Sequence, residues 1–296
     1  MDFGNGTFYA FKMTSSQQHP LSEPLPRTEY QGILFPGIVP KENLQAMETF
    51  EIRDDDVVIV SYPKSGINWM FEIVHNVLGG KSENSSPVGP EFWPPGRQQP
   101  SYIQLRETPS PRLMVTHLPT QLAPPGLANP TTEVKVIVVL RNPKDVCVSS
   151  YYFRQKNRLE KTPESWEQFS KDFLDGKVQY GDYFDHVLGW WQKQDDPHFL
   201  FVKYEDMKKD FRSSVKTIAA FLEKELTDED LARVLTNRSL ESMRKKLAES
   251  DDWRKIIVRK GIVGDWKNHF SAEESARFDQ KYREKMAGSG LEFEFE

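Results

Sequence analysis

At 296 residues, with 38% hydrophobic and 12% aromatic residues, the chain is long enough to bury a sizeable core in one or two domains. The net charge of −5 excludes a generally basic nucleic-acid-binding surface, so any anionic ligand must meet a local cluster of Lys and Arg. The single cysteine, Cys147, excludes internal disulfides and favours a reducing compartment. With no signal-peptide pattern and no run of 18 apolar residues, we expect a cytoplasmic protein that binds neither nucleic acid nor a membrane.

Stretches of different composition divide the chain. Residues 1–28 are polar and rich in Ser, Gln and Pro, which predicts a mobile N-terminal arm. Residues 29–290 are expected to form one domain, and residues 291–296 a C-terminal tail. At the start of the domain, residues 30–37 are apolar but broken by Gly and Pro, so we expect a packed loop there rather than a regular element.

An apolar run at residues 57–60 ends in a lysine set among small residues. The run is β-branched and continuous, as expected of a strand buried on both faces of a parallel sheet. A helical pattern follows at residues 68–78, so Lys64, Ser65 and Gly66 lie at a helix N-terminus, where free N–H groups attract an anion. The lysine precedes the glycine, unlike in the common nucleotide loop. The alternative is an ordinary strand–helix turn with a surface lysine.

A second apolar run, residues 112–119, contains Thr116 and His117 near its end. In a parallel sheet the carboxyl ends of the strands face the ligand, so His117 has the position of a general base. The other histidines occur in helical or loop contexts that explain them without chemistry, and a lone histidine is more often structural.

Two further strands are predicted at residues 134–140 and 199–202. The first runs into Arg141 and a helix that starts near Pro143, so Arg141 and Ser149 are expected at the same crevice, although Ser149 has the alternative of a plain helix-face position. Alternating strands and helices predict an α/β fold, a single domain with a central parallel sheet flanked by helices.

A small basic cluster, Arg259-Lys260-Gly261, stands out late in this acidic chain. It is a candidate anion site, with a surface turn as the alternative.

Four motifs in this order identify a family resemblance: Tyr62-Pro-Lys-Ser-Gly, Arg141-Asn-Pro-Lys-Asp, Lys203-Tyr-Glu-Asp-Met and Arg259-Lys-Gly-x-x-Gly-Asp-Trp-Lys-Asn. Over roughly residues 30–290 the chain resembles the cytosolic sulfotransferases. The resemblance implies transfer of a sulfonate group from 3′-phosphoadenosine 5′-phosphosulfate (PAPS) to a hydroxyl or amine, without a metal. The product nucleotide would be adenosine 3′,5′-bisphosphate, and the loop after the first strand would be a P-loop-like phosphosulfate-binding loop.

The resemblance also implies residue roles. The 5′-phosphosulfate would be held by Lys64, Ser65, Gly66, Ile67, Asn68 and Trp69. The 3′-phosphate would be bound by Arg141, Ser149, Arg259, Lys260 and Gly261, and adenine by Trp69 and Tyr204. A nucleotide-lining segment is only partly kept, as Arg238, Ser239, Leu240 and Met243. The implied catalytic residues are His117, Lys64 and Ser149, with His117 taking the acceptor proton and Lys64 neutralising the leaving group.

The acceptor is expected to be a small hydrophobic alcohol, phenol or amine. Candidate pocket residues beside His117 are Phe35, Phe92, Trp93 and Phe153, each of which could equally belong to the core.

Several positions depart from the family pattern. Val115 stands where a lysine is usual, two residues before His117, which predicts low turnover with ordinary phenols or steroids, or an unusual acceptor. Ile67 replaces a loop threonine, and Leu240 replaces a phenylalanine. The family's dimer motif is reduced to Lys267, with Ser271, Ala272 and Ala276 at its other positions, so we expect a monomer or a weak homodimer.

Three alternatives remain open at this point: a nucleotide-phosphate kinase or NTPase of related fold, a non-catalytic nucleotide binder, and a sulfotransferase whose product undergoes elimination. The kinase lacks support because no Gly-Lys pair followed by Ser or Thr is present.

Overall fold

A parallel sheet of four strands forms the centre of the protein. The computed structural model describes residues 24–80, 86–237, 241–243 and 256–296. The strands are β3 (Val57–Ser61), β4 (Leu113–Thr116), β5 (Lys135–Leu140) and β6 (Phe199–Lys203), in the order β4-β3-β5-β6. All neighbouring pairs are parallel, and every residue of β3 is buried. The predicted α/β fold with a central parallel sheet is confirmed.

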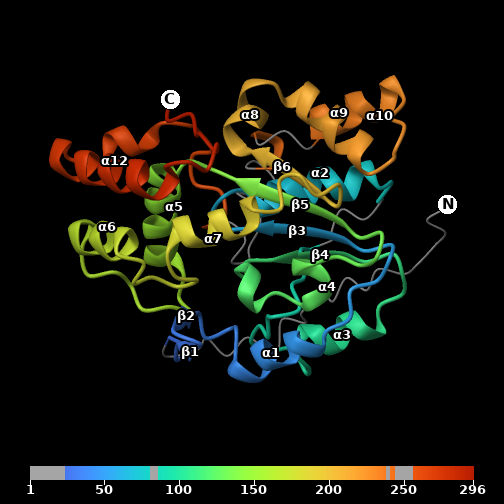
Figure 1. The fold of residues 1–296 in the computed structure, drawn as a ribbon, viewed down its shortest axis with the longest axis horizontal. Helices are drawn as coiled ribbons and strands as arrows, with labels where there is room; N and C mark the ends of the chain where they lie inside the picture. Colours follow the sequence, from blue (N-terminus) through green and yellow to red (C-terminus); the bar gives the residue numbers. More distant parts are fainter. Residues whose placement is uncertain (1–23, 81–85, 238–240, 244–255) are drawn as a thin grey trace.

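Helices cover both faces of this sheet (Figure 1). One face packs against α2 (Ile67–Val77), α9 (Phe211–Phe221) and α10 (Asp228–Asn237), through a core that includes Ile59, Ile137 and Val139. The opposite face packs against α1 (Lys41–Ala46), α4 (Pro125–Ala128) and α7 (Tyr183–Trp191), through a core that includes Val58, Val60 and Val138. Alternate strand residues therefore enter different cores, as the period of a β-strand requires.

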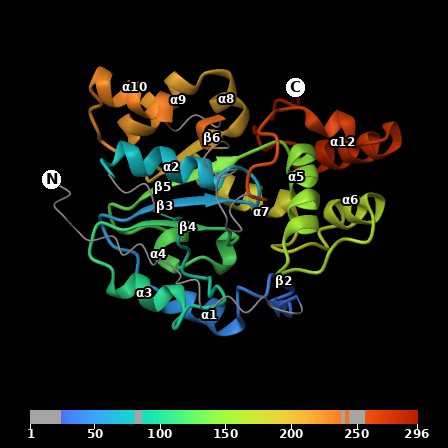
Figure 2. The same ribbon diagram turned by 180° about the vertical axis from the view of Figure 1, so that it is seen from behind.

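The remaining elements lie around this centre. They are η1 (Met47–Thr49), α3 (Ser101–Glu107), η2 (Thr120–Leu122), α5 (Pro143–Lys156), α6 (Trp166–Leu174), α8 (Tyr204–Lys209), η4 (Asp265–Asn268) and α12 (Ala272–Met286). Figure 2 shows α5, α6 and α12 together beyond the carboxyl ends of the strands. The start of α5 is fixed by Asn142, whose side chain accepts a hydrogen bond from the amide of Asp145, with Pro143 as the first helical residue.

The loop predicted for residues 30–37 is wrong, because most of that segment forms an antiparallel hairpin. Its strands are β1 (Thr28–Tyr30) and β2 (Ile33–Phe35). Gln31 and Gly32 connect them with φ angles of 48° and 76°, the left-handed conformation that a two-residue hairpin turn needs at both positions. Gly32 therefore forms the turn of a hairpin and does not prevent regular secondary structure, contrary to the prediction.

Both ends of the domain are packed. The amide of Leu25 donates to the carbonyl of Leu159, whereas residues 1–23 of the predicted arm lie outside the described residues. In the predicted tail, Leu291 and Phe293 are buried. Within the described ranges, no helix combines the length and the apolar character needed to cross a bilayer.

Candidate active site

The loop between β3 and α2 forms the floor of the site. Gly66 has a φ of 116° and begins α2, and a Cβ at this position would lie 3.0 Å from a ring carbon of Tyr204. The Ser65 hydroxyl is buried and has no hydrogen-bond partner in the described part of the chain. A glycine turn, a spare hydroxyl and the free N–H groups of a helix N-terminus make a cradle suited to an anion.

Lys64 leaves this loop in a left-handed conformation, with a φ of 72°. Its Nζ donates to the carbonyl of Ile257 at 3.1 Å and lies 4.1 Å from the ring centre of Phe153. Burial, helped by the charge of Arg141, lowers the pKa of Lys64 to about 7. The ammonium is therefore poorly solvated, and an anionic ligand beside it would favour its charged form.

Arg141, at the end of β5, connects the loop to the later basic segment. Its guanidinium donates to the carbonyls of Lys64 and Ile262, each at 3.2 Å, and stacks 4.2 Å from the ring centre of Tyr204. Its Nε is buried without a partner among the described residues, so one donor remains available.

The basic segment is organised by an acid that the sequence analysis did not single out. Asp265 accepts a hydrogen bond from Lys260 at 2.7 Å and another from Arg259. Although burial raises its pKa, these hydrogen bonds hold the pKa of Asp265 well below the usual range. Gly261 is left-handed, with a φ of 69°. The two cations thus lie side by side on one carboxylate.

Helix α5 holds this segment against the sheet. The carboxylate of Asp145 accepts hydrogen bonds from the amides of Gly264 and Trp266, at 2.8 and 3.0 Å. Ser149 is partly buried one turn further along the same helix. The helix therefore carries the predicted serine and also anchors the predicted basic cluster.

The predicted adenine residues pack against each other. The ring centres of Trp69 and Tyr204 are 5.4 Å apart, and Trp69 also stacks on Phe211. Ile67 and Met243 are buried in the same core, and Asn68 is partly buried. The predictions for Arg238, Ser239 and Leu240 fall outside the described residues.

His117 follows β4 and is held as one tautomer. Its Nδ1 lies 2.8 Å from the carbonyl of Ser61, which can only accept, so Nδ1 carries the hydrogen and Nε2 keeps a free lone pair. Burial lowers the pKa of His117 to about 4, and the nearby charge of Lys64 acts in the same direction. The imidazole is therefore neutral at pH 7. The Nε2 of His186 donates to the backbone carbonyl of His117 at 3.0 Å.

Aromatic rings surround this imidazole. Phe92 and Tyr180 meet it edge to face, with ring centres 6.2 and 5.6 Å from that of His117. Phe35 meets Tyr180 at 5.3 Å. The predicted pocket residue Trp93 is 41% exposed and donates to the carbonyl of Arg97, so it lies at the surface.

Tyr180 and Glu91 are the contacts of this region that sequence reasoning missed. Tyr180 has a φ of 67° and donates its amide to Leu34 of β2, and such a loop geometry follows from packing and has no sequence period. Glu91 is fully buried and accepts a hydrogen bond from the amide of His117. A single acid in a Pro-rich loop offers no signal beyond its type.

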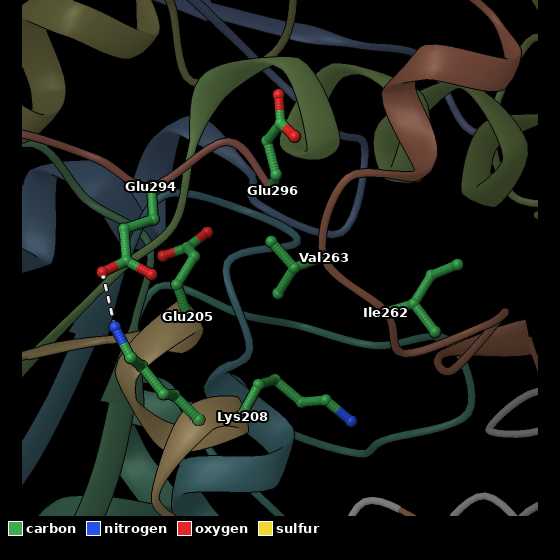
Figure 3. Close-up of a pocket in the computed structure, with 7 residues that line it drawn as sticks. Glu205, Lys208, Ile262, Val263, Glu294 and Glu296 are labelled. Carbon is green, nitrogen blue, oxygen red and sulfur yellow. Dashed lines mark hydrogen bonds and ion pairs between the residues drawn. The ribbon is translucent and has the colours of Figure 1, made fainter.

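A cavity of about 430 Å³ lies beside the basic segment (Figure 3). It is lined by Glu205, Lys208 and Lys209 of α8, Ile262 and Val263, and the C-terminal Glu294 and Glu296. The backbone carbonyl of Ile262 is the one that Arg141 contacts. The cavity therefore adjoins the basic segment without being lined by Arg259, Lys260 or Arg141.

Taken together, the carboxyl ends of the four strands bring an anion cradle, several cations and a neutral imidazole into one region. This arrangement can transfer an anionic group to a nucleophile, because cations can stabilise the leaving group while the imidazole accepts a proton. Within the described ranges, no cluster of His, Cys, Asp and Glu has the grouping of a metal site.

Comparisons with known proteins agree with this chemistry. A family model described as a sulfotransferase domain matches residues 54–290. Sulfotransferase 6B1 of Danio rerio is 38% identical over 267 residues, which cover 88% of this chain and 88% of that protein. Sulfotransferase 2B1 of Rattus norvegicus is 41% identical over 276 residues, covering 88% of this chain and 79% of that protein.

Solved structures show the same relationship. The crystal structure of mouse sulfotransferase SULT7A1 complexed with PAP superposes with a TM-score of 0.79 at 33% identity, covering 89% of this chain and 96% of that one. Because the family model spans most of the chain and the relatives are this similar, the chain belongs to the sulfotransferase family and is an enzyme of that class.

Proposed function

We propose that the protein transfers the sulfonate group of PAPS to a hydroxyl or amine of a small hydrophobic acceptor, with His117 as the general base and Lys64 stabilising the leaving group. The observation that carries the proposal is the tautomer of His117, whose Nδ1–H donates to Ser61 and leaves Nε2 free to accept a proton. The charge of Lys64 is close enough to lower the pKa of this imidazole.

The donors around the loop suit the nucleotide. The spare Ser65 hydroxyl and the spare Nε of Arg141 are buried donors that lack partners among the described residues, as expected of groups that meet an anion. Arg259 and Lys260 would meet the 3′-phosphate, for which they would exchange part of their contact with Asp265. The similar mouse enzyme was solved with PAP, adenosine 3′,5′-bisphosphate, which supports this assignment.

When bound, PAPS would supply the sulfonate group, and adenosine 3′,5′-bisphosphate would be the leaving group. His117 Nε2 would take the proton of the acceptor as its oxygen or nitrogen bonds to sulfur. Lys64 would neutralise the negative charge left on the phosphate oxygen when the sulfur–oxygen bond breaks. Proton transfer of this kind contributes about 10²- to 10⁴-fold in rate. The aromatic residues around His117 favour an apolar acceptor, which they would orient toward Nε2.

Ligand-induced thermal stabilisation tests the nucleotide assignment without an acceptor. We expect adenosine 3′,5′-bisphosphate to raise Tm by several degrees at about 100 times its Kd, since that concentration adds about 2.7 kcal/mol. ADP and ATP with magnesium serve as controls. Stabilisation by ATP with magnesium alone would contradict the proposal and favour a kinase.

A variant tests the base. We expect His117→Ala to keep the bisphosphate-induced rise in Tm and to lose about 10²- to 10⁴-fold in kcat with any acceptor that the native enzyme sulfonates. A variant that retains kcat would exclude His117 as the base while leaving the nucleotide site intact.

We also propose that the protein is cytoplasmic and a monomer or weak homodimer. The single cysteine, Cys147, is buried and free, which suits a reducing compartment. Lys267, the one kept residue of the dimer motif, is paired with Glu296 at 2.8 Å. Light scattering at micromolar concentration should give the mass of one chain, and a tight dimer would contradict this.

A further inference from the structure

Glu91 is a buried acid placed directly behind His117. Its side chain lies at 0% exposure in the loop before α3. Oε1 accepts a hydrogen bond from the amide of His117 at 2.9 Å and from the Thr116 hydroxyl at 3.0 Å. The same hydroxyl accepts from the amide of Leu118 at 3.1 Å, and Asn43 donates to the carbonyl of Glu91 at 3.1 Å. The carboxylate therefore holds the backbone on both sides of His117.

Fixing the backbone uses only one oxygen of Glu91. Oε2 is buried and has no hydrogen-bond partner in the ranges that the structure describes. A buried oxygen without a hydrogen bond costs free energy. The backbone contacts alone do not explain a carboxylate here, because an amide or an alcohol oxygen could accept the same hydrogen bonds. Burial raises the pKa of Glu91 to about 7, against the opposing hydrogen bonds from His117 and Thr116. Its charge therefore changes in the neutral range.

Charged and titratable groups face this carboxyl from several elements. Burial raises the pKa of Tyr180, before α7, and the charge of Glu91 adds to this rise. Lys64, in the loop after β3, acts in the opposite direction on His117, because its charge lowers the pKa of that imidazole, which burial already lowers. The charged and titratable groups near Glu91 and its neighbours are His117, Lys64, Glu160, Tyr180 and His186. Among them, His117 is joined to Glu91 through its backbone amide, so a positive charge on its imidazole would form on the residue that the carboxylate holds.

We propose that Glu91 is a positioning residue for the base: Oε1 fixes the backbone of His117, and the carboxylate charge stabilises the imidazolium that forms when His117 takes the acceptor proton. This inference rests on the proposed role of His117. If the charge of Glu91 stabilises the imidazolium, the enzyme is more active when Glu91 is ionised. Activity is then lost as the pH falls through the pKa of Glu91. His117 alone, with a pKa of about 4, would give no change between pH 5.5 and 8.

The coupling can be measured without any acceptor. The chain has six histidines, so NMR of ¹³C-labelled histidine gives few signals, and His117→Asn assigns the one of interest. With adenosine 3′,5′-bisphosphate bound, so that Lys64 stays charged, we expect the His117 signal to show an inflection near pH 7 that is absent in Glu91→Gln. Glu107→Gln, an exposed carboxylate on α3, is the matched control and should keep the inflection. A His117 signal that is flat near pH 7 in the native protein would overturn the electrostatic part of the proposal.

Kinetics test whether the coupling acts in turnover. With PAPS saturating, Lys64 stays charged, and with a hydroxysteroid as acceptor the hydroxyl does not titrate in this range. We expect kcat to rise from pH 5.5 to 8 as Glu91 ionises, by up to about tenfold for each unit by which its charge raises the pKa of the imidazole. Glu91→Gln should lose this rise and keep KM and Tm near native values, since its amide oxygen still accepts from His117 and Thr116. Glu91→Ala should lose Tm as well.

The outcomes separate this inference from the function it rests on. A Glu91→Gln enzyme with native kcat at every pH would overturn the role of Glu91 and leave His117 as the base. Retention of kcat by His117→Ala would remove the proposed base itself, and the catalytic role of Glu91 with it. Loss of kcat in both His117→Ala and Glu91→Gln, with the rise of kcat between pH 5.5 and 8 lost in both, would support both.

Discussion

Binding of the nucleotide should take up a proton, and Lys64 is the reason. In the free protein, burial and the charge of Arg141 lower the pKa of Lys64 to about 7, far below that of a solvated lysine. A phosphate placed beside the ammonium would favour the charged form and raise this pKa again. Above pH 7 the free lysine is therefore mostly neutral while the bound one is charged, so affinity should fall as the pH rises.

The size of this effect follows from the shifted pKa. Between pH 7 and pH 8.5 the charged fraction of free Lys64 falls from about one half to about 3%. If the bound form stays charged, Kd for adenosine 3′,5′-bisphosphate rises about 15-fold over this interval. Both phosphates of the ligand are already ionised above pH 7, so they contribute little to the change.

Isothermal titration calorimetry measures the proton directly. The bisphosphate is titrated at pH 8.5 in two buffers of different ionisation enthalpy, and the difference should correspond to about one proton taken up. At pH 7 the uptake should fall to about half a proton. Lys64→Met should bind more weakly but take up no proton, and Lys64→Arg, always charged, should also show none. An unchanged Kd from pH 7 to 8.5 in the native protein would refute the reasoning.

Three substitutions test other parts of the structure. Arg112 and Asp56 form a buried ion pair at 2.5 Å, so Arg112→Met should cost about 3–5 kcal/mol of unfolding free energy by leaving the carboxylate unpaired, and lower Tm by about 10 °C. Gly66→Ala should lower stability by about 1–3 kcal/mol in denaturant titrations and weaken bisphosphate binding, because its φ is 116° and the new Cβ would lie 3.0 Å from Tyr204. Val115→Lys should raise kcat by returning a cation to the site while lowering Tm, because Val115 is buried in an apolar core; an unchanged or lower kcat would contradict the role given to the missing lysine.

Much of the fold could be predicted because the sheet is parallel. Strands buried on both faces read as continuous apolar runs, and each predicted run became a strand of the sheet. The same geometry places the residues that follow the strands at one edge, which is why Lys64, His117 and Arg141 could be expected together, whereas Tyr204 was expected only from the family resemblance. These positions depend on chain topology and need no knowledge of loop structure.

Loop residues were harder to predict for a physical reason. The hairpin at residues 28–35 depends on two left-handed residues, and Gln31 carries no sign of that conformation in its side chain. Tyr180 reaches His117 because its amide bonds to Leu34 of that hairpin and the Tyr62 hydroxyl bonds to the carbonyl of Gly181. Contacts between distant segments of this kind have no local period, so sequence patterns cannot reveal them.

The strand order places the proposed acceptor-binding residues and the proposed nucleotide-binding residues on two different halves of the sheet. The edge strand β4 leads to His117 and its aromatic neighbours, whereas β5 and β6 lead to Arg141 and Tyr204, and β3 lies between them with Lys64. If the proposed roles hold, substitutions in the loops beside β4 would change which acceptor fits without touching the nucleotide contacts. On these proposed roles, a family built on this strand order could diversify its acceptors while keeping one donor, because the two kinds of contact would belong to separate strands.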